Sequence, residues 1–226
     1  MSTSGSIDFS MNARAIGTFA LKLLNITPTT QSPSANDLAD AVQALNMMLK
    51  TWQMSGPNLF RHTEGTVTLV ADTASYVLSP KPFRVGEARY RDSSSRDIPM
   101  WDLTRQEYTD LPMKTTTGVP TNYFVDYQRS AATMYVWPVP SSVSTETIKY
   151  TYQRAIEDID SPDNDIDIPQ EWFETVAYNL ADRLCEQYNI QGGAGDRVTR
   201  RAAQLLGIAK DSDREDVVRF VPERHG

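Results

Sequence analysis

The chain has 226 residues, of which 40% are hydrophobic and 23% are charged, a composition typical of a globular protein. A chain of this length can bury a core without metal ions or disulfides, and its single cysteine, Cys185, fits synthesis in a reducing compartment. The net charge of −7 disfavours tight binding to a phosphate backbone, although a protein that only surrounds DNA remains compatible with it. No apolar run is long enough to predict a membrane span, and the polar start does not resemble a signal peptide.

Two amphipathic helices are expected near the start of the chain. The first is predicted over residues 12–25 and ends at Asn25 and Pro28, and the second begins after Ser34 and ends at Gly56-Pro57. Ser34, three residues before Asp37, resembles an N-terminal capping box. Apolar residues spaced three and four apart carry both predictions: Ile16, Phe19, Ala20, Leu23 and Leu24, then Leu38, Ala41, Val42, Leu45, Met48, Leu49 and Trp52.

The middle of the chain changes to the period of two that is typical of β-strands. Residues 128–133 are interpreted as a hairpin connection, and a short helix is expected within residues 103–111. Short strands joined by turns favour a small antiparallel sandwich or barrel. The predicted strands lie at Val67–Leu69, Tyr76–Leu78, Phe83–Tyr90, Tyr123–Tyr127, Met134–Trp137 and Ile148–Tyr152.

The last third returns to a helical pattern, with Pro169 in the first turn, a break at Gly192–Gly195 and a final helix over residues 196–208. The predicted fold class is therefore α+β: a helical bundle built from both termini with an inserted antiparallel β-sandwich or barrel-like region. Residues 12–58 and 169–209 would form the helical core and residues 60–155 the β domain. An acidic connector at 156–168 and a C-terminal tail at 210–226 complete this division.

The acidic residues Asp163, Asp165, Asp167 and Glu174 have the spacing of positions in a calcium-binding loop. The glycine that such a loop requires is replaced by Ile168, so a solvated connection before the next helix is the favoured interpretation. The glycine run Gly192–Gly195 precedes a helix but lacks the lysine of a phosphate-binding loop, and a simple connector is favoured there as well.

No catalytic, metal or cofactor site is expected. His62 is placed in a loop and His225 in the tail, and neither has a partner at catalytic or metal-ligand spacing. Cys185 lies on an apolar helix face and is interpreted as inert core. The chain is therefore not expected to be an enzyme.

Two groups of residues are candidates for contacts with other molecules. Arg197, Arg200 and Arg201 could contact DNA or an acidic partner, or could simply be a solvated helix face. The β-prone tail segment could dock on another chain by strand addition or through an apolar anchor, or could pack back on its own domain; it consists of Val217, Val218, Arg219, Phe220 and Val221.

Several motifs occur in an order that resembles a known family. They are Leu45-Asn46-x-Met48-Leu49-x-x-Trp52, Val136-Trp137-Pro138-x-Pro140, and Ile168-Pro169 followed by Tyr178, Leu180, Ala181, Leu184 and Tyr188. Over residues 12–208 the chain resembles the head-to-tail adaptor (connector) proteins of short-tailed bacteriophages, of the tubular-tail-protein-A and packaged-DNA-stabilising types.

This resemblance implies a virion protein made in the host cytoplasm. It would form a dodecameric ring beneath the portal protein ring, extend the DNA channel and receive the tail nozzle protein. DNA would pass through the lumen without sequence-specific binding, and the C-terminal segment would reach the portal. The alternatives are a small monomeric assembly or binding factor and a cell-wall hydrolase, for which the sequence offers no paired carboxylates.

Overall fold

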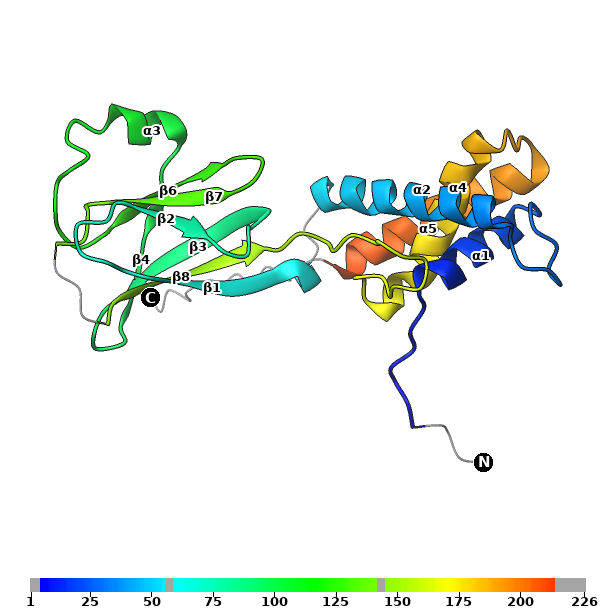
Figure 1. Cartoon of the computed structure of the whole chain (residues 1–226), viewed down its shortest axis with the longest axis horizontal. Coiled ribbons are helices and arrows are strands. Elements are labelled where there is room, and N and C mark those ends of the chain that lie inside the picture. Colours follow the sequence, from blue (N-terminus) through cyan, green and yellow to red (C-terminus); the bar gives the residue numbers. More distant parts are fainter. Residues whose placement is uncertain (1–4, 56–58, 142–144, 214–226) are drawn as a thin grey trace, which may run out of the picture. The chain divides into compact units, whose positions relative to one another are not determined.

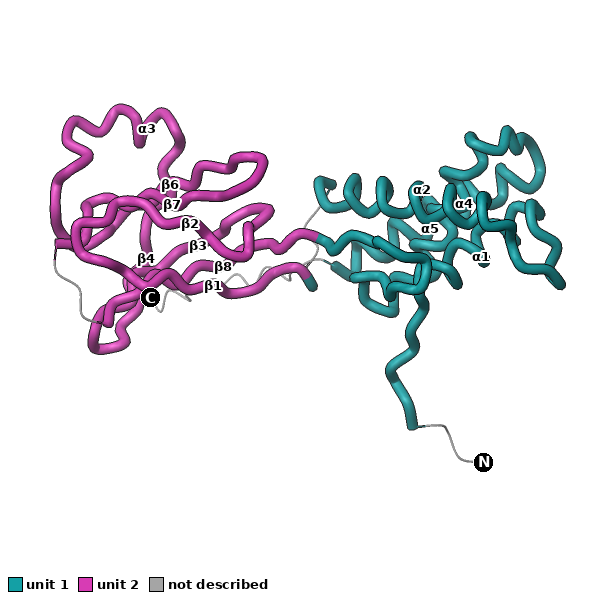
Figure 2. Tube along the Cα trace, viewed as in Figure 1, with its two compact units in different colours: residues 1–60, 156–226 teal, residues 61–155 magenta. Residues whose placement is uncertain are grey.

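The computed structural model describes residues 5–55, 59–141 and 145–213 (Figure 1). The chain divides into two compact units, unit 1 with Met1–Phe60 and Ile156–Gly226, and unit 2 with Arg61–Ala155 (Figure 2). Unit 1 contains helices α1 (Ala13–Leu23), α2 (Ala35–Met54), α4 (Phe173–Gln187) and α5 (Gly193–Ser212), with a 3-10 helix, η2 (Gln170–Trp172), before α4. A second 3-10 helix, η1 (Leu59–Arg61), lies where the chain passes into unit 2.

The predicted starts of the first two helices are confirmed by their caps. Asn12 Oδ1 accepts the N–H of Ala15 at 2.9 Å, and Ser34 Oγ accepts the N–H of Asp37 at 3.1 Å. These bonds satisfy N–H groups that have no partner within the helix. After α1 the chain turns at Asn25, whose φ is 57°. Among the described helices, none combines the length and apolarity needed to cross a membrane.

The inward face of α1 differs at one position from the predicted stripe. Phe19, expected in the core, is 42% exposed, whereas Gly17 and Leu21 are buried. A Cβ on Gly17 would lie 3.3 Å from the Cβ of Ala41 in α2, so glycine permits close approach of the two helices. The helix is rotated toward this contact, which turns Phe19 outward against Tyr178.

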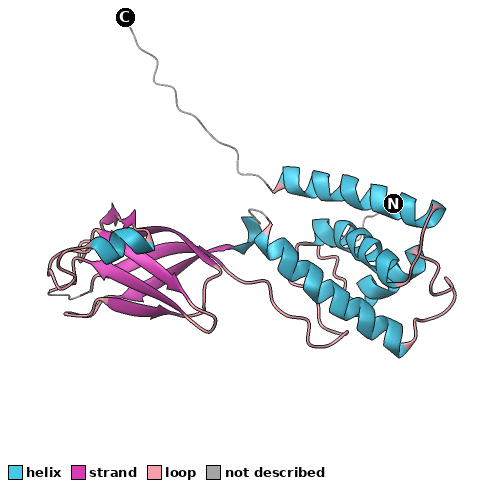
Figure 3. Ribbon diagram, turned by 90° about the horizontal axis from the view of Figure 1, so that it is seen from above, coloured by secondary structure: helices cyan, strands magenta, loops and turns pink. Residues whose placement is uncertain are grey.

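The core of unit 1 forms around α4, which packs against α1, α2 and α5 (Figure 3). Its fully buried residues include Leu45, Met48, Leu180 and Leu184. Pro169 precedes η2 and does not lie within the first turn of an α-helix as predicted. The glycine run was also placed wrongly, because α5 already begins at Gly193 and continues to Ser212.

The acidic segment 156–168 packs on α2. The side chain of Asn46 donates to the carbonyl of Ile159 and accepts its N–H, both at 2.9 Å. Lys50 Nζ donates to the carbonyl of Ile156 at 2.6 Å. The carboxylates of this segment face mainly outward, as the interpretation of a solvated connection requires, but its isoleucines are buried in the core: Ile156, Ile159, Ile166 and Ile168.

Unit 2 is a sandwich of two four-stranded sheets, β1-β8-β3-β4 and β2-β7-β6-β5. The strands are β1 (His62–Thr68), β2 (Ser75–Leu78), β3 (Arg84–Arg91), β4 (Asp97–Pro99), β5 (Trp101–Asp102), β6 (Asn122–Tyr127), β7 (Ala132–Trp137) and β8 (Thr147–Gln153). Both sheets supply the core between them, with residues such as Val67, Tyr90, Met134, Val136 and Ile148. The predicted hairpin is confirmed as β6 and β7.

Two features of the sandwich depart from the predicted antiparallel pattern. The short strands β4 and β5 were not predicted, and β5 pairs with β6 in the parallel direction. Between them Met100 is buried, and its N–H donates to the carbonyl of Ala88 at 2.9 Å. The chain therefore leaves one sheet and joins the other at Met100, which sets the direction of β5.

Strand β3 contains a bulge, which follows from the spacing of its buried side chains. Val85 and Ala88 are both buried although they are three residues apart, and they pair with Tyr152 and Tyr150, which are two apart. Because side chains alternate along a regular strand, one extra residue must bulge between them.

Helix α3 (Arg105–Asp110) lies over β6 and β7 on the outer side of their sheet (Figures 1 and 3). Thr104 and Glu107 form a reciprocal capping box that holds its start. Tyr108 stacks on Phe124 with ring centroids 5.3 Å apart and also contacts Tyr135 at 5.4 Å. The short helix thus covers an aromatic cluster on the outer face of the sheet.

Candidate functional site

The acidic residues whose spacing resembles a calcium-binding loop are engaged with separate partners. Asp163 accepts a hydrogen bond from Arg14 Nε at 2.7 Å, and this bond holds the pKa of Asp163 below its usual value. Asp167 accepts the N–H of Glu157 at 3.1 Å. Within residues 5–55, 59–141 and 145–213, no three His, Cys, Asp or Glu side chains come together as a metal site would require.

Of the three residues considered for a catalytic or metal site, His62 and Cys185 lie within the described residues, and both make contacts inside their own unit. His62 was placed in a loop, but it is the first residue of β1, and its Nε2 lies 2.9 Å from Gln153 Nε2 on β8. Cys185 is buried on α4 as predicted, and burial, with a smaller effect of Asp182, raises the pKa of its thiol. A thiol with a raised pKa is a poor nucleophile. His225 lies outside the described residues.

The three arginines of α5 do not act as one group. All are exposed, but Arg201 Nη2 forms an ion pair with Glu174 Oε1 at 3.0 Å and so connects α5 to α4. Arg197 and Arg200 extend from the same helix into solvent. The opposite face of α5 buries Val198, Ala202 and Leu205 in unit 1. The predicted tail segment, Val217–Val221, lies outside the described residues.

A groove of about 760 Å³ lies on unit 1 between α2, α4 and α5. Its apolar lining comes from Ala44, Met47, Trp52, Cys185 and Leu206, and its polar lining from Asn179, Asp182, Arg183, Glu186, Gln187 and Thr199. This groove was not predicted from the sequence, because α2, which supplies part of its lining, lies far in the chain from α4 and α5.

The sides of this groove are held by hydrogen bonds between α4 and α5. Asn179 Nδ2 donates to the carbonyl of Ala202 in α5 at 3.2 Å, and also to the carbonyl of Thr175 in its own helix at 2.8 Å. The hydroxyl of Thr199 donates to Asp182. The groove therefore combines a fixed shape with exposed apolar surface, since the side chain of Met47 is 54% exposed.

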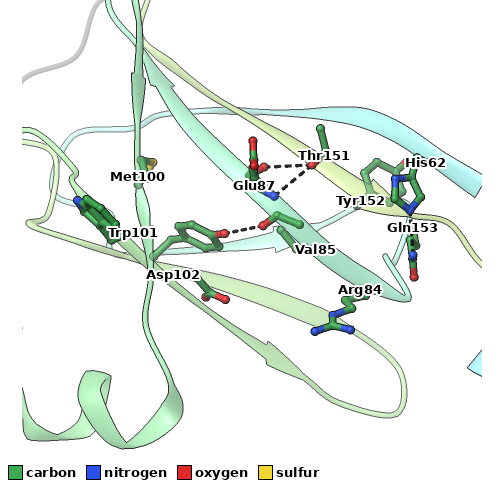
Figure 4. Close-up of a pocket in the computed structure, with 12 residues that line it drawn as sticks. His62, Arg84, Val85, Glu87, Met100, Trp101, Asp102, Thr151, Tyr152 and Gln153 are labelled. Carbon is green, nitrogen blue, oxygen red and sulfur yellow. Dashed lines mark hydrogen bonds between the residues drawn. The ribbon is translucent and has the colours of Figure 1, made fainter. Parts of the chain in front are cut away.

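A second hollow, of about 490 Å³, lies on unit 2 beside the β3 bulge (Figure 4). Tyr123 Oη donates to the carbonyl of Gly86 at 2.5 Å, and Thr151 Oγ1 accepts the N–H of Glu87 at 3.1 Å. These side chains satisfy backbone groups that the bulge removes from the ladder. Trp101 stands at the hollow's edge and is 75% exposed. Asp102, also in the lining, has its pKa raised mainly by burial.

The negative charge of the chain belongs to unit 1. This unit has 11 Lys and Arg against 19 Asp and Glu, whereas unit 2 has 11 against 10, which gives net charges of −8 and +1. The two units therefore present different electrostatic surfaces to a partner.

Comparison with known proteins gives one match to a family over most of the chain. The model of the SU10 adaptor protein family matches residues 11–222, which include both units. Among solved structures, a chain in the neck of an empty GTA particle has 11% sequence identity and a TM-score of 0.32, and the match covers 79% of each chain. No match was found among curated proteins.

Proposed function

This chain belongs to the SU10 adaptor protein family, and we propose that it is a structural adaptor at the head-to-tail junction of a phage-like particle. The observation that carries the proposal is the family match over residues 11–222. The proposed neighbours are the portal protein ring on one side and the tail nozzle protein on the other. Copies of the chain would close into a ring, with a dodecamer as the expected size.

A closed ring requires each copy to contact the next through two different surfaces. The packed helices of unit 1 can hold such surfaces at a fixed angle, because their core and caps leave little freedom for rearrangement. The acidic character of unit 1 also suits a channel through which DNA passes without being held, since like charges repel. We propose a structural role without catalysis.

Arg197 and Arg200 are the proposed contacts of α5. An acidic surface of a neighbouring copy or of the portal is the favoured partner, because unit 1 itself carries a net charge of −8. Replacing both with Ala should weaken ring formation while leaving the circular dichroism spectrum unchanged. If the double variant assembles as the wild type does, these residues are not at an interface.

The C-terminal segment Val217–Val221 is the proposed contact with the portal. The apolar residues on both sides of Arg219 suit strand addition or an apolar anchor on another chain. All the described helices and strands end before residue 214, so a truncation that removes residues 214–226 deletes no part of them. We therefore expect the truncated chain to fold normally and to bind the portal ring more weakly.

The decisive experiment is mass measurement of the purified chain, alone and mixed with its portal ring. Adaptor function predicts a defined stoichiometric complex with the portal, formed by the full chain and diminished by the truncation. A chain that stays monomeric and never joins the portal would be an assembly factor of another kind. Unfolding of the truncated chain would place the tail in the core and contradict its docking role.

A further inference from the structure

The groove between α2, α4 and α5 has the shape and chemistry of a binding site for a short peptide. Its lining includes three large apolar side chains, here called the floor: Met47, Trp52 and Leu206. It also includes three charged side chains, here called the rim: the carboxylates of Asp182 and Glu186 and the guanidinium of Arg183, so that negative groups outnumber positive ones. An apolar floor with a mainly acidic rim fits a segment in which apolar residues flank a basic one. Such a ligand would bury the exposed part of Met47.

The C-terminal segment of this chain has that composition. Val217, Val218, Phe220 and Val221 surround Arg219, and Arg224 follows shortly after. Phe220 is the largest apolar side chain of the segment and suits the floor of the groove. Arg219 suits the carboxylates of its rim, since an arginine can form two hydrogen bonds with one carboxylate.

The position of α5 allows the segment that follows it in the sequence to reach the groove. Leu206 lines the groove, and α5 ends at Ser212, six residues later, which corresponds to about 9 Å along a helix. The residues from Asp213 to Val217 can span roughly 17 Å when extended, so the chain can turn back and reach the groove. The helix that forms one wall of the groove is thus followed in the sequence by the segment whose composition fits the groove.

We propose that the groove binds the C-terminal segment of the same chain before assembly. The acidic rim holds Arg219, and the apolar floor buries Phe220. A segment bound there is not available to the portal, so groove binding and portal docking exclude each other. This last step rests on the proposed function, whereas groove binding itself does not.

The test uses cysteines placed across the proposed contact in the full-length chain. In a Cys185→Ala background, Met47→Cys and Val221→Cys, which keep the anchor Phe220, should form a disulfide within one chain on mild oxidation. The product would run faster on a non-reducing gel and keep the monomer mass. The matched control replaces Met47→Cys with Ser32→Cys. Ser32 is exposed and precedes α2, whose first residue, Ala35, lies about 18 Å along the helix from Met47. The control should form no such bond.

A charge exchange checks the role of the rim. Glu186→Lys should slow disulfide formation by about threefold, and adding Arg219→Glu should restore it, because the opposite charges are then exchanged. Absence of the disulfide in the Met47→Cys chain would overturn the proposal. A disulfide between two chains would also overturn it, since the groove would then hold the segment of a second copy.

Adding the portal ring separates this proposal from the proposed function. If the chain binds the portal and the disulfide forms more slowly, groove binding and docking compete as proposed. An unchanged rate in the bound complex would overturn the competition. If the chain fails to bind the portal but the disulfide still forms, the groove binds the segment and the adaptor function is the part that fails.

Discussion

Gly65 shows how one residue controls the packing of a strand. It lies in β1 opposite Tyr150 of β8, and a Cβ on it would lie 2.3 Å from Tyr150 Cζ. Tyr150 is buried, so its ring could move only into a packed core. We expect Gly65→Ala to lower the free energy of unfolding by about 1–3 kcal/mol, measured by urea denaturation.

The control for this prediction is Gly193→Ala at the first residue of α5, where an added Cβ would meet nothing within 4 Å. This variant should keep or slightly raise the stability, because alanine favours a helix. If both variants lost the same free energy of unfolding, the contact with Tyr150 would not be the reason that position 65 requires glycine.

Asp37 makes the stability of unit 1 depend on pH. Its carboxylate accepts hydrogen bonds from Ser34 Oγ at 2.6 Å and Tyr188 Oη at 2.9 Å, and these bonds hold the pKa of Asp37 below its usual value. Burial, followed by the interaction with Asp37, raises the pKa of Tyr188 to about 12. Because the pKa of Asp37 is lower in the folded state, its contribution is present above the usual aspartate pKa and is lost as the pH falls through the folded value.

We therefore expect Asp37→Asn to reduce the free energy of unfolding by about 1 kcal/mol at neutral pH. The difference from the wild type should shrink as the pH falls below the usual aspartate value of about 3.9. Urea denaturation at several pH values measures both quantities. A difference that stays constant from neutral to acid pH would rule out the charged form as its source.

At the scale of elements, the cap of α3 supports the aromatic cluster on the outer face of unit 2. Thr104 Oγ1 accepts the N–H of Glu107 at 3.2 Å, while the Glu107 carboxylate accepts the N–H of Thr104 at 2.7 Å. Thr104→Ala should destabilise unit 2 by about 1 kcal/mol and loosen Tyr108, whereas Thr104→Ser should retain most of the stability. Near-UV circular dichroism during thermal unfolding would detect both effects. If Thr104→Ser destabilised unit 2 as much as Thr104→Ala, the hydroxyl of Thr104 would not be the source of the stability.

The long amphipathic helices and the main hairpin could be predicted because their signals are local. The apolar stripe of α2 and the cap at Ser34 involve residues in adjacent turns, and β6 and β7 are joined by a short connection. Strands β4 and β5 gave no such signal, since they have three and two residues. The β3 bulge is visible in the spacing of Val85 and Ala88, but only the pairing with β8 shows that both residues face the core.

At the scale of the whole molecule, the chain enters and leaves unit 2 at neighbouring positions. His62 pairs with Gln153, and the N–H of Arg154 donates to the carbonyl of Arg61 at 3.0 Å. Its two ends are thus neighbouring residues of a strand pair, the arrangement expected of an inserted domain. We expect residues 61–155 expressed alone to fold into the sandwich and unfold cooperatively. A fragment without near-UV circular dichroism or a cooperative transition would show that unit 2 needs unit 1.

The sequence by itself determined the fold class, the main helices and the presence of a β region between them, because hydrophobic period and caps act between residues close in the chain. It also carried the resemblance to head-to-tail adaptors, in agreement with the SU10 adaptor family match. Only the tertiary structure decided which charges meet, as with Arg14 and Asp163, which are 149 residues apart. It also decided that Arg201 pairs with Glu174 within unit 1 and that α2, α4 and α5 together form a groove. Such contacts depend on how packed elements are placed in space, which no local pattern of residues specifies.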